Sequence, residues 1–217
     1  TRSLLEDIEI DGEGARPNSS VDNQVPRDRI AQYTPAIITS VEELSKSIYL
    51  VKTRLKQPLP SSLPPQFVNL WVPGYEAIPL SITYRSGGEL WFIVKPVGET
   101  TYRLINMKPS SYIGLYGPLG KPLVPRVKGR LLLLSGGSGL ASISQYMQYY
   151  CRGVYCRVVH AGWRFEDIGW IPEYVKSLNG DPVTVCMDEE CEVKGVLSDY
   201  LALDAVSSYE YIIICGP

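Results

Sequence analysis

One stretch of the chain combines a buried strand, a glycine turn and a helix. Residues 130–142 read Arg-Leu-Leu-Leu-Leu-Ser-Gly-Gly-Ser-Gly-Leu-Ala-Ser. Four leucines without alternation are typical of a strand buried on both faces of a parallel sheet, and the glycines allow a sharp turn that a ligand can approach closely. The helix expected at 140–150 would present free N–H groups to a phosphate or pyrophosphate. A purely structural turn is the alternative.

Strand-like and helix-like segments alternate from this stretch to the end of the chain. This alternation predicts a doubly wound parallel sheet, in which ligands bind beyond the carboxyl ends of the strands. We therefore expect ligand contacts at Ser135–Ser142, His160–Arg164 and Cys215–Pro217. The expected strands are 131–135, 154–160, 183–187 and 210–215, and the expected helices are 140–150, 171–178 and 196–202.

Residues 33–125 have an all-β texture. Short β-prone runs are separated by turn signals, and the sequence Ser86-Gly87-Gly88 predicts a hairpin turn. Such short, regular strands predict a small antiparallel barrel, because closure removes exposed edges. The expected strands are 36–39, 47–52, 66–72, 80–84, 89–94 and 112–116. A domain boundary is predicted near 122–128, which gives domains 33–125 and 126–217, and the second is interpreted as truncated at its C-terminal end.

Residues 1–32 are acidic at the start and lack apolar periodicity. Such a segment buries too little apolar surface to offset the conformational entropy lost on folding. Two interpretations stay open, a solvated tail and an extended N-terminal arm that wraps a partner subunit.

Charge and hydropathy narrow the class of protein. The 217 residues carry a net charge of −2 with 20% charged residues, which argues against nucleic acid and anionic membranes as partners. The apolar runs 131–134 and 211–215 are far shorter than the roughly 20 residues that span a bilayer. No signal peptide opens the sequence. We expect a soluble, cytoplasmic protein that binds small molecules or proteins.

Cysteine and histidine positions do not predict a metal site. Two pairs, Cys151 with Cys156 and Cys186 with Cys191, have metal-like spacing. The predicted topology places the pairs at opposite strand ends, about 17 Å apart, so a shared site is not expected. Local disulfides and free thiols stay open. His160, the one histidine, is interpreted as a strand-end residue, because no nucleophile neighbours it.

Five motifs in order resemble those of the ferredoxin-NADP reductase superfamily. Within it, the electron-transfer subunit of heteromeric dihydroorotate dehydrogenase is the nearest resemblance, with reductase subunits of soluble hydrogenases second. The resemblance covers roughly residues 34–217. It implies an antiparallel flavin-binding barrel followed by a doubly wound nucleotide-binding domain. The motifs are Pro79-Leu80-Ser81-Ile82, Val97-Gly98-Glu99-Thr100-Thr101, Gly117-Pro118-Leu119-Gly120, Gly136-Gly137-Ser138-Gly139-Leu140-Ala141 and Cys215-Gly216-Pro217.

The resemblance implies two FAD-binding segments. Pro79, Leu80, Ser81 and Ile82 match the flavin segment, in which Leu80 would pack on the ring and Ser81 would hydrogen-bond near its reactive nitrogen. The family's arginine before this segment is Ile78 here. The FAD pyrophosphate would be held at a second segment. Its assigned residues are Lys95, Val97, Gly98, Thr100 and Thr101. Lys95 stands where arginine is usual and offers a point charge in place of a bidentate contact.

The resemblance also implies an NAD(P)-binding half. The glycine turn would hold the pyrophosphate, although the family's Ala-Pro after it is Ala141-Ser142 here. Arg164 would face the adenosine end, and Cys215-Gly216-Pro217 would lie under the nicotinamide. A buried cysteine at a strand end is the alternative for Cys215. Ser81 and Cys215 are the candidate catalytic residues. The candidate NAD(P)-binding residues are Gly136, Gly137, Gly139, Leu140, Gly162, Arg164, Asp188, Gly216 and Pro217.

The implied function is electron transfer from NAD(P)H through FAD to a catalytic dehydrogenase subunit, as in pyrimidine biosynthesis. NAD and NADP stay open. The close family carries a [2Fe-2S] cluster after the Cys-Gly-Pro strand, and we expect a cluster only if a segment follows Pro217. A flavin-free structural or docking subunit of the same fold is the alternative, suggested by Ile78 and the arm.

Overall fold

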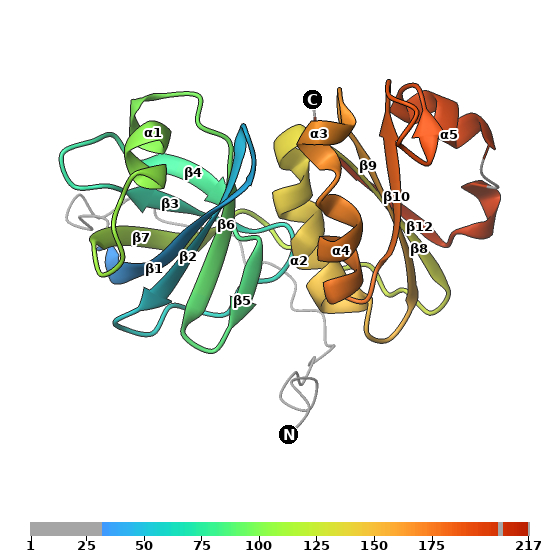
Figure 1. Cartoon of the computed structure of the whole chain (residues 1–217). Coiled ribbons are helices and arrows are strands. Elements are labelled where there is room, and N and C mark those ends of the chain that lie inside the picture. Colours follow the sequence, from blue (N-terminus) through green and yellow to red (C-terminus); the bar gives the residue numbers. More distant parts are fainter. Residues whose placement is uncertain (1–31, 204–205, 217) are drawn as a thin grey trace, which may run out of the picture. The chain divides into compact units, whose positions relative to one another are not determined.

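The structure, a computed structural model, describes residues 32–203 and 206–216. The predicted N-terminal arm therefore lies, apart from residue 32, outside the described residues, as does Pro217. The described residues form two sheets, one built from residues 34–119 and the other from residues 130–215 (Figure 1). The predicted domain boundary lies between these sheets.

The first sheet is antiparallel, with strand order β4-β3-β7-β1-β2-β6-β5. Its two end strands, β4 and β5, are consecutive in the chain and are joined by Ile82 and Thr83. The sheet therefore curls back on itself as the predicted barrel. Thr83 holds this seam, because its N–H donates to the Trp91 carbonyl (2.9 Å) and its Oγ1 accepts from the Ile93 N–H (2.8 Å). The strands are β1 (Thr34–Ser45), β2 (Ile48–Leu55), β3 (Phe67–Trp71), β4 (Ile78–Ser81), β5 (Tyr84–Ser86), β6 (Glu89–Val94) and β7 (Tyr112–Leu119).

Two details of the barrel differ from the sequence prediction. The strand expected at 80–84 is divided into β4 and β5. Helix α1 (Glu99–Ile105) lies in a region predicted to be all-β, so that prediction was wrong there. Its seven residues are too few to display a helical period, and its Leu104 enters the barrel core. The predicted hairpin turn is present, since Ser86 pairs with Glu89 across Gly87 and Gly88.

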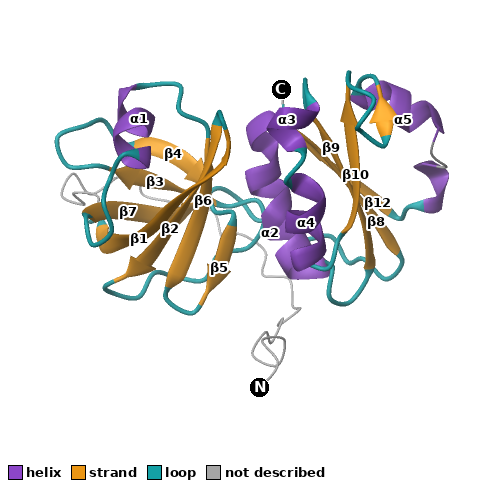
Figure 2. Cartoon of the chain, viewed as in Figure 1, coloured by secondary structure: helices purple, strands orange, loops and turns teal. Residues whose placement is uncertain are grey.

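The second sheet has five parallel strands in the order β11-β10-β9-β8-β12. Leu131 and Leu133 pack with α2 and α4 on one face, whereas Leu132 and Leu134 pack with α5 on the other. Figure 2 shows helices on both sides of this sheet, which confirms the doubly wound prediction. The elements are β8 (Arg130–Gly136), α2 (Leu140–Tyr150), β9 (Tyr155–Ala161), α3 (Phe165–Ile168), α4 (Ile171–Ser177), β10 (Asp181–Cys186), β11 (Val193–Lys194), α5 (Leu197–Leu203) and β12 (Tyr211–Cys215).

Helix α2 is buried along most of its length because it also contacts the barrel. Two of its glutamines bind the barrel main chain. Gln148 Oε1 accepts the Arg85 N–H (3.0 Å), and Gln145 Nε2 donates to the Gln66 carbonyl (2.5 Å). These bonds hold the second half of α2 against the barrel.

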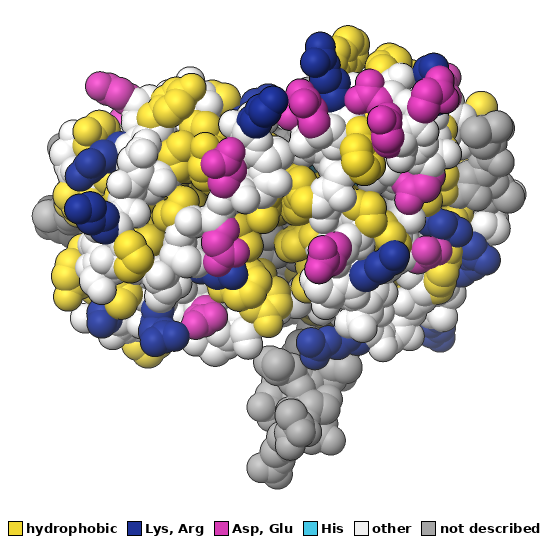
Figure 3. Space-filling model, viewed as in Figure 1, with side chains coloured by type: hydrophobic (Ala, Val, Ile, Leu, Met, Phe, Trp, Pro, Cys, Tyr) yellow, Lys and Arg dark blue, Asp and Glu magenta, His cyan; other side chains and the backbone are white. Residues whose placement is uncertain are grey.

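The four paired cysteines form two local disulfides, Cys151–Cys156 and Cys186–Cys191, with Cα–Cα distances of 5.4 and 5.8 Å. This decides between the two alternatives that the sequence left open. Within residues 32–203 and 206–216, no three histidine, cysteine or acidic side chains group as metal ligands. No helix in the same described part is long and apolar enough to cross a bilayer. On the face drawn in Figure 3, acidic and basic side chains are interspersed.

Candidate functional site

The glycine turn (Gly136–Gly139) links β8 to α2 at the carboxyl edge of the parallel sheet. Gly137 has φ of +51°, the left-handed region that favours glycine, and a Cβ built on it would meet nothing within 4 Å. Gly137 and Ser138 are exposed. The turn therefore offers an open stretch of main chain directly before a helix N-terminus, as the sequence predicted.

The end of β12 supports this turn from the neighbouring strand. Cys215 pairs in register with Ser135 of β8. A Cβ on Gly139 would lie 2.1 Å from the Cys215 carbonyl oxygen, and a Cβ on Gly216 would lie 2.9 Å from the Gly136 nitrogen. Two predicted motifs are thus packed main chain to main chain. Cys215 itself is a half-buried free thiol at this edge.

Two predicted cofactor-binding positions have a packing role. The Leu140 side chain is buried in the core beneath α2, so it faces away from the open turn. Gly162 donates its N–H to the Val185 carbonyl (3.0 Å), and a Cβ on it would collide with Ile168 of α3 at 2.3 Å. The residue type at both positions follows from packing alone.

Asp188 and Arg164 lie on either side of the start of α3. Asp188 Oδ2 accepts the Phe165 N–H (2.8 Å), so this carboxylate caps α3 from the end of β10. Arg164 is exposed, with Nη1 3.9 Å from Glu166 Oε1. The capping contact leaves Asp188 occupied within the chain and holds the neighbouring Arg164 at the sheet edge.

His160 lies in β9 beneath the glycine turn and is only 3% exposed. Its Nδ1 is 2.8 Å from Ser135 Oγ. Burial lowers the pKa of His160 to about 4, so the ring is neutral at neutral pH. His160 is a strand residue near the end of β9, as interpreted, but a serine hydroxyl does neighbour its ring, contrary to the reason given from the sequence. Both side chains are buried, so the pair is a structural hydrogen bond.

Strand β4 carries the predicted flavin segment. Pro79 is exposed, Leu80 is half-buried, and the Ile82 side chain lies in the barrel core, where only its main chain could reach a ligand. Ser81 Oγ lies 3.0 Å from Ser142 Oγ, in the first turn of α2. This contact joins the candidate flavin strand to the helix that follows the glycine turn. The sequence analysis noted Ser142 only as a departure from the family's proline.

The barrel loop (Lys95–Thr101) is closed on itself. Thr101 Oγ1 accepts the N–H groups of both Val97 and Gly98 (3.0 Å each) and donates to the Gly98 carbonyl (2.8 Å). Thr100 Oγ1 donates to the Glu76 carbonyl (3.1 Å). The Lys95 side chain is exposed. Two amides and both hydroxyls that the resemblance assigns to a pyrophosphate are therefore engaged within the chain.

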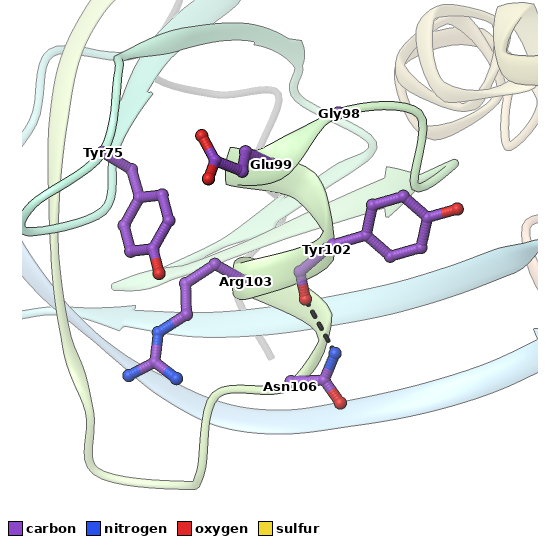
Figure 4. Close-up of a pocket in the computed structure, with 6 residues that line it drawn as sticks. All are labelled: Tyr75, Gly98, Glu99, Tyr102, Arg103 and Asn106. Atoms are coloured by element: carbon purple, nitrogen blue, oxygen red, sulfur yellow. Dashed lines mark hydrogen bonds between the residues drawn. The ribbon is translucent and has the colours of Figure 1, made fainter.

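A hollow of about 490 Å³ lies beside the first turn of α1. Figure 4 shows Arg103 and Glu99 extending from α1 toward Tyr75, while Tyr102 points to the opposite side. Arg103 is exposed, and no ion pair involving it is found among the described residues. The first N–H groups of α1 have no partner within the helix. The hollow is lined by Tyr75, Gly98, Glu99, Tyr102, Arg103 and Asn106.

Sequence reasoning missed Arg103, although a signal was present. Arg103 lies two residues after the end of the phosphate motif and four residues, about one helical turn, after Glu99. Recognising this required the helix that the sequence analysis did not predict. A cation beside an aromatic ring suits a phosphate-bearing ligand, whereas the Glu99 carboxylate in the same lining disfavours an anion.

Comparison with known proteins agrees with this geometry. No protein-family model matches the chain. A probable dihydroorotate dehydrogenase B (NAD(+)), electron transfer subunit, from Archaeoglobus fulgidus is 32% identical over 181 residues, covering 82% of this chain and 72% of the relative. The chain belongs to this family of electron transfer subunits. The resemblance stated from the motifs is confirmed.

Other members and solved structures extend the comparison. A probable electron transfer subunit from Pyrococcus furiosus is 29% identical, and the match covers 71% of this chain and 59% of that relative. Among solved structures, an NADH-dependent reduced ferredoxin-NADP oxidoreductase superposes with a TM-score of 0.73 at 22% identity, covering 83% of this chain and 67% of that one. This likeness shows that the present chain has the ferredoxin reductase fold.

Proposed function

We propose that this chain carries electrons from NAD(P)H, through FAD, to a catalytic dehydrogenase partner subunit. The observation that carries the proposal is the 3.0 Å contact between Ser81 and Ser142. It brings the strand expected to line a flavin against the helix that begins at an open glycine turn. Family membership supports the same reading, because the relatives are probable dihydroorotate dehydrogenase B electron transfer subunits.

The glycine turn is proposed to hold the NAD(P) pyrophosphate. Gly137 leaves its main chain open, and the first-turn N–H groups of α2 and the positive end of its dipole favour an anion there. The tight contact of Gly139 with the end of β12 fixes the position of this turn. Cys215, at the same edge, is proposed to contact the nicotinamide ring.

The hollow beside α1 is proposed to hold the diphosphate of FAD. Arg103 would supply the cation that the family places at the position of Ile78 here. An arginine can bind a phosphate with two N–H groups, which the exposed Lys95 cannot do. The first-turn amides of α1 would complete the contact, while Val97 and Gly98 amides stay bonded to Thr101.

Leu80 and Ser81 are proposed to contact the ring of the flavin. When bound, FAD supplies a two-electron acceptor that can release electrons singly. Leu80 offers an apolar surface, and the Ser81 hydroxyl offers one hydrogen bond beside it. The residues named here bind and orient, and hydride transfer demands no general base from them.

An iron-sulfur cluster is not proposed within these residues. The chain has five cysteines, and four of them are paired in disulfides. Cys215 alone cannot supply the four ligands that such a cluster takes.

Spectroscopy of the purified protein tests the proposal. We expect a flavin absorption band, either as isolated or after reconstitution with FAD, and oxidation of NADH or NADPH with an artificial electron acceptor. A colourless protein that takes up no FAD and oxidises neither nucleotide would contradict the proposal. That result would favour the flavin-free docking subunit, which the closed barrel loop and Ile78 also suit.

A further inference from the structure

Ser142 occupies a special position in the first turn of α2. The resembling family places a proline after the alanine of the glycine motif, whereas this chain has Ala141-Ser142. The Ser142 side chain is 8% exposed, and its Oγ is 3.0 Å from Ser81 Oγ. By contrast, Ser144 in the next half-turn donates its hydroxyl to the Leu140 carbonyl four residues earlier. Ser142 therefore contacts the barrel, whereas Ser144 bonds its own helix and accepts the Tyr174 hydroxyl of α4 (3.0 Å).

The direction of the bond between two hydroxyls decides what Ser81 can do. Each hydroxyl has one proton to donate and two lone pairs. If Ser81 donates to Ser142, Ser81 can only accept from a ligand. If Ser142 donates to Ser81, the Ser81 proton is free to bind an acceptor nitrogen of a ring beside Leu80. A proline at position 142 could not orient Ser81 in this way.

We propose that Ser142 is a positioning residue that orients the Ser81 hydroxyl toward the flavin ring. This inference rests on the function proposed above. Because Ser142 is a first-turn residue, its replacement does not break the interior of α2. The hydroxyl stands at the position where the motif of the resembling family has proline.

Single-turnover reduction of the FAD-loaded protein by NADH and by NADPH gives the first measurement. We expect Ser142→Ala to lower the rate of flavin reduction by about fivefold, the effect of one lost hydrogen bond, with unchanged nucleotide affinity. Ser142→Thr keeps the hydroxyl and should restore the rate to within about twofold. Ser144→Ala is the matched control, since it removes a hydroxyl of the same helix that does not touch Ser81, and it should leave the rate unchanged.

A double variant tests whether Ser142 affects the rate of flavin reduction through Ser81 or independently of it. If Ser142 acts through Ser81, the Ser81→Ala/Ser142→Ala protein is no slower than Ser81→Ala alone. Effects that multiply would overturn the proposal. The midpoint potential and visible spectrum of the bound flavin give a second readout, in which Ser142→Ala should shift both in the same direction as Ser81→Ala, with no shift for Ser144→Ala.

Failure of this inference differs from failure of the proposed function. A wild-type protein that takes up no FAD overturns both. A wild-type protein that is reduced normally, with Ser142→Ala identical to it in rate and potential, overturns the role of Ser142 alone. Ser142→Pro places a proline in the first turn of α2, where proline is tolerated, and is a second hydroxyl-free variant if Ser142→Ala melts early. It is expected to match Ser142→Ala in rate and potential.

Discussion

The glycine turn and the barrel loop were both expected to bind a pyrophosphate through main-chain amides, yet they differ in how those amides are used. At the glycine turn, Gly137 faces open space, and the surrounding contacts only fix its position. At the barrel loop, Thr101 already accepts the Val97 and Gly98 amides. A glycine-containing motif therefore does not by itself provide free donors. A nearby hydroxyl side chain can satisfy them first, and other groups must then hold the ligand.

The largest effect is expected from Gly139→Ala. Its new Cβ would lie 2.1 Å from the Cys215 carbonyl oxygen, a main-chain atom that a change of side-chain rotamer cannot move. The free energy of unfolding should fall by about 3 kcal/mol, and nucleotide binding should be lost with it. Urea unfolding measures the first and NADH titration the second.

Gly153→Ala is the matched control for that variant. A Cβ at Gly153 would meet only the Tyr150 carbonyl, at 3.9 Å, which is ordinary contact. A stability within about 0.5 kcal/mol of the wild type is expected for it. Equal losses for the two variants would show that contact between the turn and β12 does not organise this edge of the sheet.

The support beneath the glycine turn should depend on pH. Burial places the pKa of His160 at about 4 in the folded protein, below its ordinary value of 6.5. Between these values the unfolded chain binds more protons, so the stabilisation is fully present above pH 6.5 and is lost as pH falls toward 4. Lowering the pH from 6.5 to 4.5 should cost about 2 kcal/mol through this group. Unfolding measured across this range in wild type and His160→Asn should show a shallower slope for the variant, and parallel slopes would exclude His160 as the source.

Thr101→Val tests whether the barrel loop is closed by a hydroxyl. Valine keeps the shape of threonine but leaves the Val97 and Gly98 amides without their acceptor. We expect a loss of about 1.5 kcal/mol in the free energy of unfolding, because the hydrogen bonds of the buried Thr101 hydroxyl are lost. Thr101→Ser should recover most of the loss. If valine were neutral, the two amides would be free for a ligand, and the contrast with the glycine turn would disappear.

The sequence predicted features that depend on residues close together in the chain, and it missed those that depend on residues far apart. The buried strand and the glycine turn were predictable. A strand buried on both faces is recorded as a continuous apolar run, and a left-handed backbone conformation is recorded as a glycine. The Ser81–Ser142 contact joins residues 61 positions apart, so no local pattern records it. Asp188 was assigned to a cofactor from its place after a strand, but that place also lets it cap α3. The disulfides stayed open because spacing alone does not distinguish a bridge from two thiols.

Arg103→Ala should give the smallest of these effects, and it bears directly on how a closed loop can still bind FAD. If Arg103 supplies the cation missing at Ile78, its loss should raise the Kd for FAD about fivefold to tenfold, the effect of one charge-assisted hydrogen bond. The salt dependence of FAD binding should weaken as well, because a charge pair with phosphate is lost. Lys121→Ala removes an exposed cation outside the hollow and should change neither quantity. FAD titration followed by flavin fluorescence at low and high salt measures both. Equal FAD affinities for Arg103→Ala and Lys121→Ala would mean that the hollow holds the diphosphate without a side-chain cation. The hollow beside α1 and the glycine turn would then both bind phosphate through main-chain amides alone.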